Sequence, residues 1–69
     1  MADHVYKVVE VVGTSRESIS KAIDVGIAKA SQSLRHLGWF EVTSVRGQIA
    51  DGKIAHYQAC LKVGFTLED

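Results

Sequence analysis

The shortness of the chain, with only one cysteine in it, is the feature that most limits what it can fold into. A domain of 69 residues buries only about 60% of the surface that its unfolded chain exposes, so it needs disulfides, a metal or self-association to be stable. One cysteine, Cys60, cannot form an internal bridge. The three histidines, His4, His36 and His56, stand far apart and lack the spacing of zinc ligands. We therefore expect a single domain over residues 1–69, no metal site, and self-association.

Composition limits the partners of the chain. Eight basic and eight acidic residues cancel, which predicts no attraction to nucleic acid or to an anionic membrane surface. The N-terminal segment lacks signal-peptide character, and no segment approaches the roughly 20 apolar residues of a membrane span. The single cysteine fits a reducing compartment. We therefore expect a cytoplasmic protein.

Three segments have the composition of β-strands. Residues Val5–Val12 are β-branched and aromatic with charges between them, and Gly13 is predicted to end this first strand. Two further strands are predicted at Trp39–Ile49 and Ile54–Phe65. The Asp-Gly pair at 51–52 is typical of a tight hairpin turn, so these two strands should pair directly.

An amphipathic helix is predicted between the first and second strands. Thr14 and Glu17 have the spacing of a capping box, so the helix should begin near Ser15. Gly38 would end it as a left-handed cap, which makes the helix about 22 residues long. Its apolar stripe contains Ile19, Ala22, Ile23, Gly26, Ile27, Ala30, Leu34 and Leu37. Because glycine is unfavourable inside a helix, Gly26 in this stripe predicts a close approach of the helix backbone to the sheet.

These elements predict an α+β fold, a β-α-β-β chain whose three-stranded antiparallel sheet packs on one long helix. The third strand would lie between the other two, because the helix makes the first and second strands parallel. The hairpin turn predicts four cross-strand pairs: Ala50 with Lys53, Ile49 with Ile54, Val45 with Gln58, and Glu41 with Lys62. The last pair places opposite charges across from each other, which favours this register over a shift by one residue.

The two faces of the predicted hairpin differ in character. One carries Phe40, Val42, Ala55, Tyr57, Ala59, Leu61 and Val63 and is predicted to pack on the helix. The other carries Trp39, Glu41, Thr43, Val45, Ile54, His56, Gln58, Cys60 and Lys62. This second face is too apolar for solvent and too polar for a core, so we expect other subunits and a ligand there.

A few residues on these elements are candidates for ligand binding. Trp39, the only tryptophan, would either pack at an oligomer contact or offer a flat platform to a planar ligand. Gln58 would either be solvated or bond a heterocycle edge with its one acceptor and two donors. Arg46 would be a surface charge or hold a phosphate. Simple alternation places it on the face opposite Trp39, so it could serve the same ligand only through a bulge, a bend or a contribution from a neighbouring subunit. Lys29 and Arg35, near the helix end, could attract a second anionic ligand, although such charges are nearly always solvated.

Catalytic patterns are missing from the sequence. It contains no Gly-rich phosphate loop, no G-x-S-x-G turn and no H-E-x-x-H pair. His56 is interpreted as a polar strand residue, and Cys60 as a small buried hydrophobe. We therefore expect a binding protein and not an enzyme.

Five stretches in fixed order carry a resemblance to a known family over essentially the whole chain. They are V-Y-K-V-x-E-V-x-G-T-S, A-I-x-x-x-I-x-x-A, L-x-W-F-E-V, G-x-I and Y-Q-x-x-L-K-V-G-F. In this order and within so short a chain, the set resembles the dodecins. The resemblance implies a hollow homododecamer of β-α-β-β subunits that binds flavins, FMN or riboflavin, in stacked pairs between symmetry-related tryptophans.

The resemblance also implies roles for individual residues. Trp39 would stack on the flavin, Gln58 would bond the pyrimidine edge of the isoalloxazine, and Arg46 would contact the phosphate of FMN. Thr66 stands where several bacterial members have arginine, which leaves open whether FMN or riboflavin is preferred. Bacterial relatives also look able to bind coenzyme A, for which Lys29 is the candidate.

The function implied by the resemblance is flavin storage and sequestration. An indole against an excited flavin can transfer an electron and quench it, so bound flavin would be kept from photochemistry. This task needs proximity and exclusion of solvent, which agrees with the missing catalytic groups. The alternatives are a coenzyme A-binding protein and a purely structural oligomeric shell.

Overall fold

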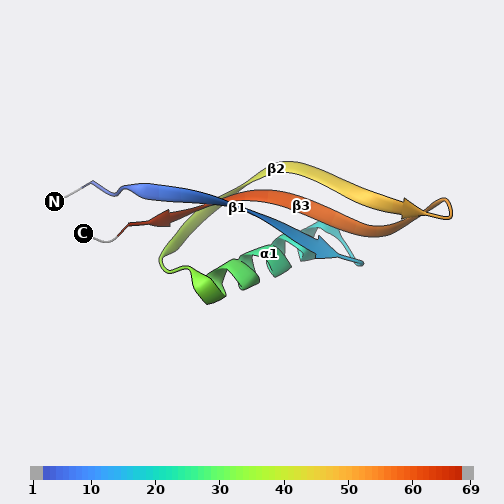
Figure 1. The fold of residues 1–69 in the computed structure, drawn as a ribbon, viewed down its shortest axis with the longest axis horizontal. Helices are drawn as coiled ribbons and strands as arrows, with labels where there is room; N and C mark the ends of the chain where they lie inside the picture. The colour runs from blue at the N-terminus through green and yellow to red at the C-terminus, as the bar shows by residue number, and fades with distance from the viewer. Residues whose placement is uncertain (1–2, 68–69) are drawn as a thin grey trace.

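The computed structural model describes residues 3–67 and has the predicted β-α-β-β order (Figure 1). The elements are β1 (Tyr6–Ser15), α1 (Ile19–Ser33), β2 (Leu37–Ala50) and β3 (Lys53–Thr66). β3 lies between β1 and β2 and pairs antiparallel with both. The turn between β2 and β3 has positive φ angles at Asp51 and Gly52, as the tight hairpin turn requires. The predicted fold class and strand order are confirmed.

β1 continues through Gly13 to Ser15, so the prediction that Gly13 ends this strand was wrong. Gly13 is buried and pairs with Ala59 of β3. A Cβ atom on Gly13 would overlap the carbonyl oxygen of Ala22 and lie 2.9 Å from the backbone nitrogen of Gly26. The glycine therefore serves close packing of β1 on α1, and the close approach predicted from Gly26 is confirmed.

The N-terminus of α1 is capped by Ser18, whose Oγ accepts a hydrogen bond from the backbone N–H of Lys21 at 3.0 Å. The predicted capping box between Thr14 and Glu17 was wrong, because Thr14 is still part of β1. The N–H of Glu17 instead donates to the Oγ of Ser15 at 2.9 Å. A serine-capped turn thus separates the end of the strand from the start of the helix.

The C-terminus of α1 also differs from the prediction. Leu34 caps it, and its N–H donates to the carbonyl oxygen of Ala30 at 2.9 Å. The left-handed residue that follows the helix is His36, with φ of 60°, and Gly38 lies inside β2. The helix therefore has 15 residues and not the expected 22 or so.

Replacing Ser18 with alanine is expected to lower the free energy of unfolding by about 1 kcal/mol per chain, the usual cost of losing an N-cap side chain. Denaturant unfolding at a fixed protein concentration measures it. Ser20→Ala, an exposed position inside the same helix, is the matched control and should be neutral or slightly stabilising. Equal losses from the two variants would contradict the assignment of Ser18 as the cap.

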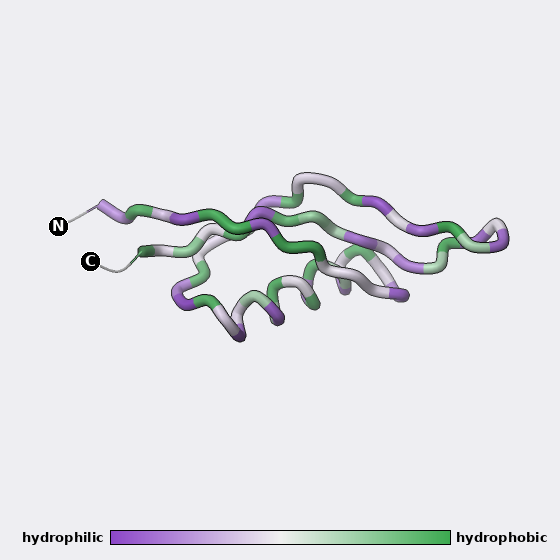
Figure 2. Tube along the Cα trace, viewed as in Figure 1, coloured by the Kyte–Doolittle hydropathy of each residue, from purple (hydrophilic) through white to green (hydrophobic). Residues whose placement is uncertain are grey.

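α1 packs against β1 and β3 and leaves β2 largely uncovered (Figure 1). The buried apolar core consists of Ala22, Ala30, Ala59, Leu61 and Val63. Phe40 and Val42 face the helix side of the sheet as predicted, but they are 49% and 38% exposed because α1 lies over the other two strands. The hairpin of β2 and β3 extends past β1 and α1, and apolar segments reach its polar tip (Figures 1 and 2).

Two β-bulges shift the pairing in the middle of the hairpin. The predicted partners are confirmed at both ends: Ala50 with Lys53, Ile49 with Ile54, and Glu41 with Lys62. Between them, Ala55 on β3 and Thr43 on β2 are each skipped in the ladder. The predicted pairing of Val45 with Gln58 was therefore wrong, and Arg46 lies opposite Gln58.

The bulges also correct the predicted faces, since one extra residue reverses the alternation of side chains. Val45 pairs with Ala59 and so lies on the helix side. Ile54 joins it there through its pairing with Ile49. Arg46, which simple alternation placed opposite Trp39, lies on the same side of the sheet as Trp39.

Candidate functional site

The candidate site lies on the side of the sheet that faces away from α1, which we call the open face. The ladders align four rows of residues across it, each in the order β1, β3, β2: Val8–Gly64–Trp39, Glu10–Lys62–Glu41, Val12–Cys60–Ser44 and Thr14–Gln58–Arg46. The first of these rows is apolar, the second is charged, and the last contains an amide and a guanidinium. An aromatic ring stands at one end of it, and a guanidinium with an amide stands toward the hairpin.

Trp39 supplies the aromatic end of the open face. Its indole lies directly over the backbone of Gly64, so close that a Cβ atom added to that glycine would overlap the ring. Tyr6 tilts against it from β1, with ring centroids 6.0 Å apart and an angle of 58° between the planes. The side chain of Trp39 remains 41% exposed. The indole is thus supported by its own subunit and still presents a surface to another molecule.

Arg46 and Gln58 form the polar end of the open face. They are direct cross-strand partners, so their side chains leave the same side of the sheet within contact range. Gln58 is half-buried, and Arg46 is exposed. The bulge at Thr43 produces this arrangement. An amide that can both donate and accept therefore stands beside a cation with several donors.

Cys60 lies beside this polar end, half-buried and not enclosed in the core as the sequence had suggested. The Nη2 of Arg46 donates a hydrogen bond to its Sγ at 3.2 Å. Hydrogen bonds from Ser44 and then from Arg46 lower the pKa of the Cys60 thiol from its usual value, against smaller opposing effects of desolvation and of the Glu10 charge. The thiol is therefore part of the same polar cluster.

The aromatic and polar ends lie far apart within one chain. Gly64 and Gln58, the β3 partners of Trp39 and Arg46, are six residues apart, or about 20 Å at roughly 3.3 Å per residue. A single tricyclic ring cannot touch both ends of the same chain. Any site that uses Trp39 together with Gln58 must take them from different copies of the protein.

Comparison with known proteins identifies the family. The dodecin family model matches residues 5–68. The chain belongs to the dodecin family. It is 51% identical over 65 residues to a dodecin of Thermus thermophilus, and the match covers 94% of each chain. Dodecins are small binding proteins and not enzymes, which agrees with the expectation from the sequence.

Solved structures of other dodecins have the same fold. A dodecin from Streptomyces davaonensis is 53% identical with a TM-score of 0.94, over 99% of this chain and 100% of that one. A dodecin from Streptomyces coelicolor is 55% identical with a TM-score of 0.94, over 100% of this chain and 99% of that one. The likeness thus extends to the whole subunit.

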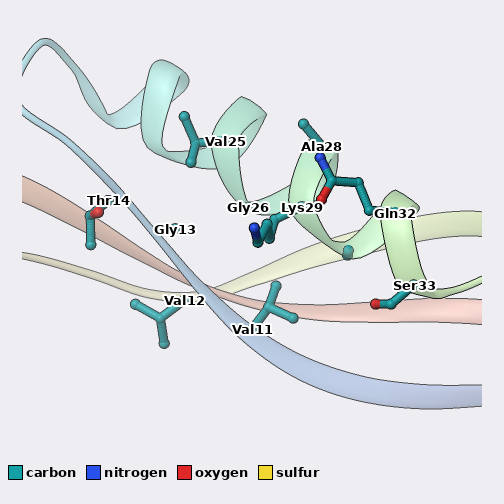
Figure 3. Close-up of a pocket in the computed structure, with 11 residues that line it drawn as sticks. Val11, Val12, Gly13, Thr14, Val25, Gly26, Ala28, Lys29, Gln32 and Ser33 are labelled. Carbon is teal, nitrogen blue, oxygen red and sulfur yellow. The ribbon is translucent and has the colours of Figure 1, made fainter.

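Two weaker candidates lie at different places in this dodecin. Thr66, at the end of β3, pairs with Tyr6 and is half-buried near the aromatic end. Its backbone N–H donates to the carbonyl oxygen of His36 at 3.1 Å. Lys29 lines a groove of about 610 Å³ between α1 and β1 (Figure 3). It therefore lies on the helix side of the sheet, away from Trp39, Arg46 and Gln58.

The described part of the chain has neither a cluster of metal-binding side chains nor a helix that could span a membrane. Within residues 3–67, histidine, cysteine, aspartate and glutamate form no group of three or more that could hold a metal ion. The one helix among these residues is too short to cross a membrane.

Sequence reasoning missed three residues that shape the site. Gly64, which makes room for the indole, falls opposite Trp39 in the predicted register and could have been found from it. Tyr6 lies in the predicted first strand, but nothing in the sequence shows that its ring meets Trp39. The bulge at Thr43 carries no glycine or proline to signal it.

Proposed function

We propose that this protein stores and sequesters flavin, as FMN or riboflavin, in stacked pairs within a homododecameric shell. The single observation that carries the proposal is the open face. It presents an exposed indole at one end and a paired amide and guanidinium at the other. Members of the dodecin family bind flavins and form homododecamers, and this chain matches the family model almost throughout.

The residues of the open face fit a flavin chemically. The exposed indole of Trp39 offers a planar surface on which an aromatic ring can stack. Gln58 offers both an acceptor and donors, which suits a pyrimidine edge that carries both kinds of group. Arg46 offers a fork of donors that suits a phosphate. When light excites a bound flavin, the flavin would accept an electron from the adjacent indole, and its fluorescence would be quenched.

The spacing of these residues and the small core both support a homo-oligomer. Because the two ends of one open face lie about 20 Å apart, a complete site would combine Trp39 of one subunit with Gln58 of another. The uncovered hairpin also exposes Val45, Ile49 and Ile54, which are 45%, 75% and 59% exposed. Burial of these side chains between copies would supply the apolar stabilisation that 69 residues lack.

Titration of the ligand-free protein with riboflavin and with FMN tests the proposal. We expect flavin fluorescence to be quenched until about one flavin per chain is bound, since a pair would lie between two tryptophans. Native mass should equal that of twelve 7.5 kDa chains. A folded monomer, or a shell that leaves the fluorescence of both flavins unchanged, would overturn it.

Coenzyme A binding is the second candidate function. It is favoured by the groove between β1 and α1, which has apolar walls and Lys29 at its side (Figure 3). Thermal release of small molecules from the purified protein, followed by mass spectrometry, distinguishes the candidates. Release of coenzyme A without flavin would favour the second one, and release of neither, with no uptake of either, would favour a purely structural shell.

A further inference from the structure

The guanidinium of Arg46 is held against β3 by Cys60, which is not one of the positions that carry the family resemblance. Its Nη2 donates to the Sγ of Cys60 at 3.2 Å. The backbone carbonyl oxygen of Cys60 also accepts a hydrogen bond from the Oγ1 of Thr43 at 3.1 Å. Cys60 therefore contacts both the bulge that turns Arg46 to the open face and the head of the Arg46 side chain.

These two contacts restrict where the guanidinium can be. Without the bulge at Thr43, Arg46 would face the helix side. The hydrogen bond from Thr43 to Cys60 stabilises the bulge and so helps to keep Arg46 on the open face. An exposed arginine samples many rotamers, and each bond that holds its planar head reduces the freedom left to lose on binding. One donor goes to the sulfur, and the others remain available to a phosphate.

We propose that Cys60 is a positioning residue for Arg46 and sets how strongly the flavin site prefers a phosphorylated flavin. The inference rests on the proposed function. The chemistry it adds is specific to the phosphate, because the guanidinium of Arg46 suits the charged phosphate of FMN, and riboflavin has only a neutral hydroxyl in that place. Cys60 itself touches Arg46 and not the ligand.

The charge of the thiol should make this preference depend on pH. As a neutral thiol, Cys60 is a weak acceptor that holds the guanidinium and leaves its charge for the phosphate. As a thiolate, it pairs with Arg46 and repels the phosphate. The other charged groups aligned near it on the open face are Glu10 of β1, Lys62 of β3 and Glu41 of β2.

The sign follows from these charges. Where the phosphate of FMN is fully ionised, above its second pKa of about 6, the ratio of FMN affinity to riboflavin affinity is expected to be highest below the pKa of Cys60 and to fall as the pH rises through it. Hydrogen bonds from Ser44 and Arg46 lower that pKa, so the fall begins at a lower pH than for an ordinary cysteine. By linkage, bound FMN should raise the pKa of Cys60 and riboflavin should not.

Fluorescence titrations with both flavins test the proposal. At pH 7, Cys60→Val is expected to weaken FMN binding about 2- to 10-fold, the range that one neutral hydrogen bond supplies, with riboflavin affinity unchanged. Cys60→Ser keeps an acceptor and should restore most of the FMN affinity, but it should lose the dependence on pH. If the valine variant weakened both flavins equally, or neither, the positioning role would be wrong.

A measurement without flavin separates this inference from the proposed function. The chain has one cysteine, so selective ¹³C labelling gives a single Cβ signal whose pH titration reports the pKa of Cys60. Arg46→Ala should raise that pKa, and Lys53→Ala, which removes an exposed cation near the hairpin tip, should leave it unchanged. An unchanged pKa in the Arg46 variant would overturn the inference, whereas a wild-type protein that binds no flavin would overturn the proposed function.

Discussion

Replacing Gly13 with alanine is expected to cost about 3 kcal/mol of unfolding free energy per chain or more, and to leave little assembled protein. The added Cβ would overlap the carbonyl oxygen of Ala22 and lie 2.9 Å from the backbone nitrogen of Gly26. Backbone atoms cannot rotate away, so α1 would have to shift off β1. Overpacking of a core usually costs about 1–3 kcal/mol, and a clash with helix backbone belongs at the upper end.

Native mass and denaturant unfolding at a fixed protein concentration measure this effect, since assembly and stability are coupled by concentration. Gly26→Ala is the matched control, because Gly26 faces the same contact from the helix. Its Cβ would lie 3.2 Å from a side-chain methyl group of Leu61, which can move, and alanine is better than glycine in a helix by about 1 kcal/mol. A near-wild-type Gly13→Ala variant would show that β1 and α1 are not in such close contact.

The outline of the fold could be predicted because it depends on patterns that span whole elements. The Asp-Gly turn, together with a helical connection that makes β1 and β2 parallel, led to the correct strand order. The element ends were less predictable, since several small polar residues compete there. Thr14 and Glu17 satisfy the spacing of a capping box, but Ser18 caps the helix because β1 is extended for longer than its composition indicates.

The register of the hairpin could be predicted from the sequence only in part, for a different reason. The Asp-Gly turn and the pairing of Glu41 with Lys62 agree with one uninterrupted ladder, and both are correct. The bulges at Ala55 and Thr43 lie on opposite strands and cancel, so from Trp39 to the hairpin turn the ladder is shifted only between these two positions. A sequence pattern that is satisfied at both ends carries no sign of two compensating bulges.

This shift had its largest effect on the candidate site. Trp39 and Gln58 were correctly predicted to share a face, because even-numbered positions of β3 alternate regularly from Gln58 to Gly64. Arg46 was assigned to the wrong face, since it lies on the shifted part of β2. The distance of about 20 Å between the two ends also follows from the register, and it makes one chain insufficient for the proposed flavin site.

Removing the indole at Trp39 is expected to abolish quenching of flavin fluorescence and to weaken flavin binding about 5- to 150-fold. Alanine leaves no ring on which the flavin can stack, and stacking on an aromatic side chain is worth about 1–3 kcal/mol by alanine substitution. The backbone should tolerate the change, because the indole lies 41% exposed on the surface of Gly64 and is not part of the buried core. Native mass is therefore expected to stay that of the wild-type shell.

Two further variants make this result specific to an electron-donating ring in the right place. Trp39→Phe keeps an aromatic surface but removes the better electron donor, so it should bind flavin more strongly than Trp39→Ala and quench it less than the wild type. Phe40→Ala removes a ring of similar exposure, 49%, from the opposite face, and at equal native mass it should quench as the wild type does. Full quenching by an assembled Trp39→Ala shell would contradict the proposal that flavins stack on the indoles of different copies.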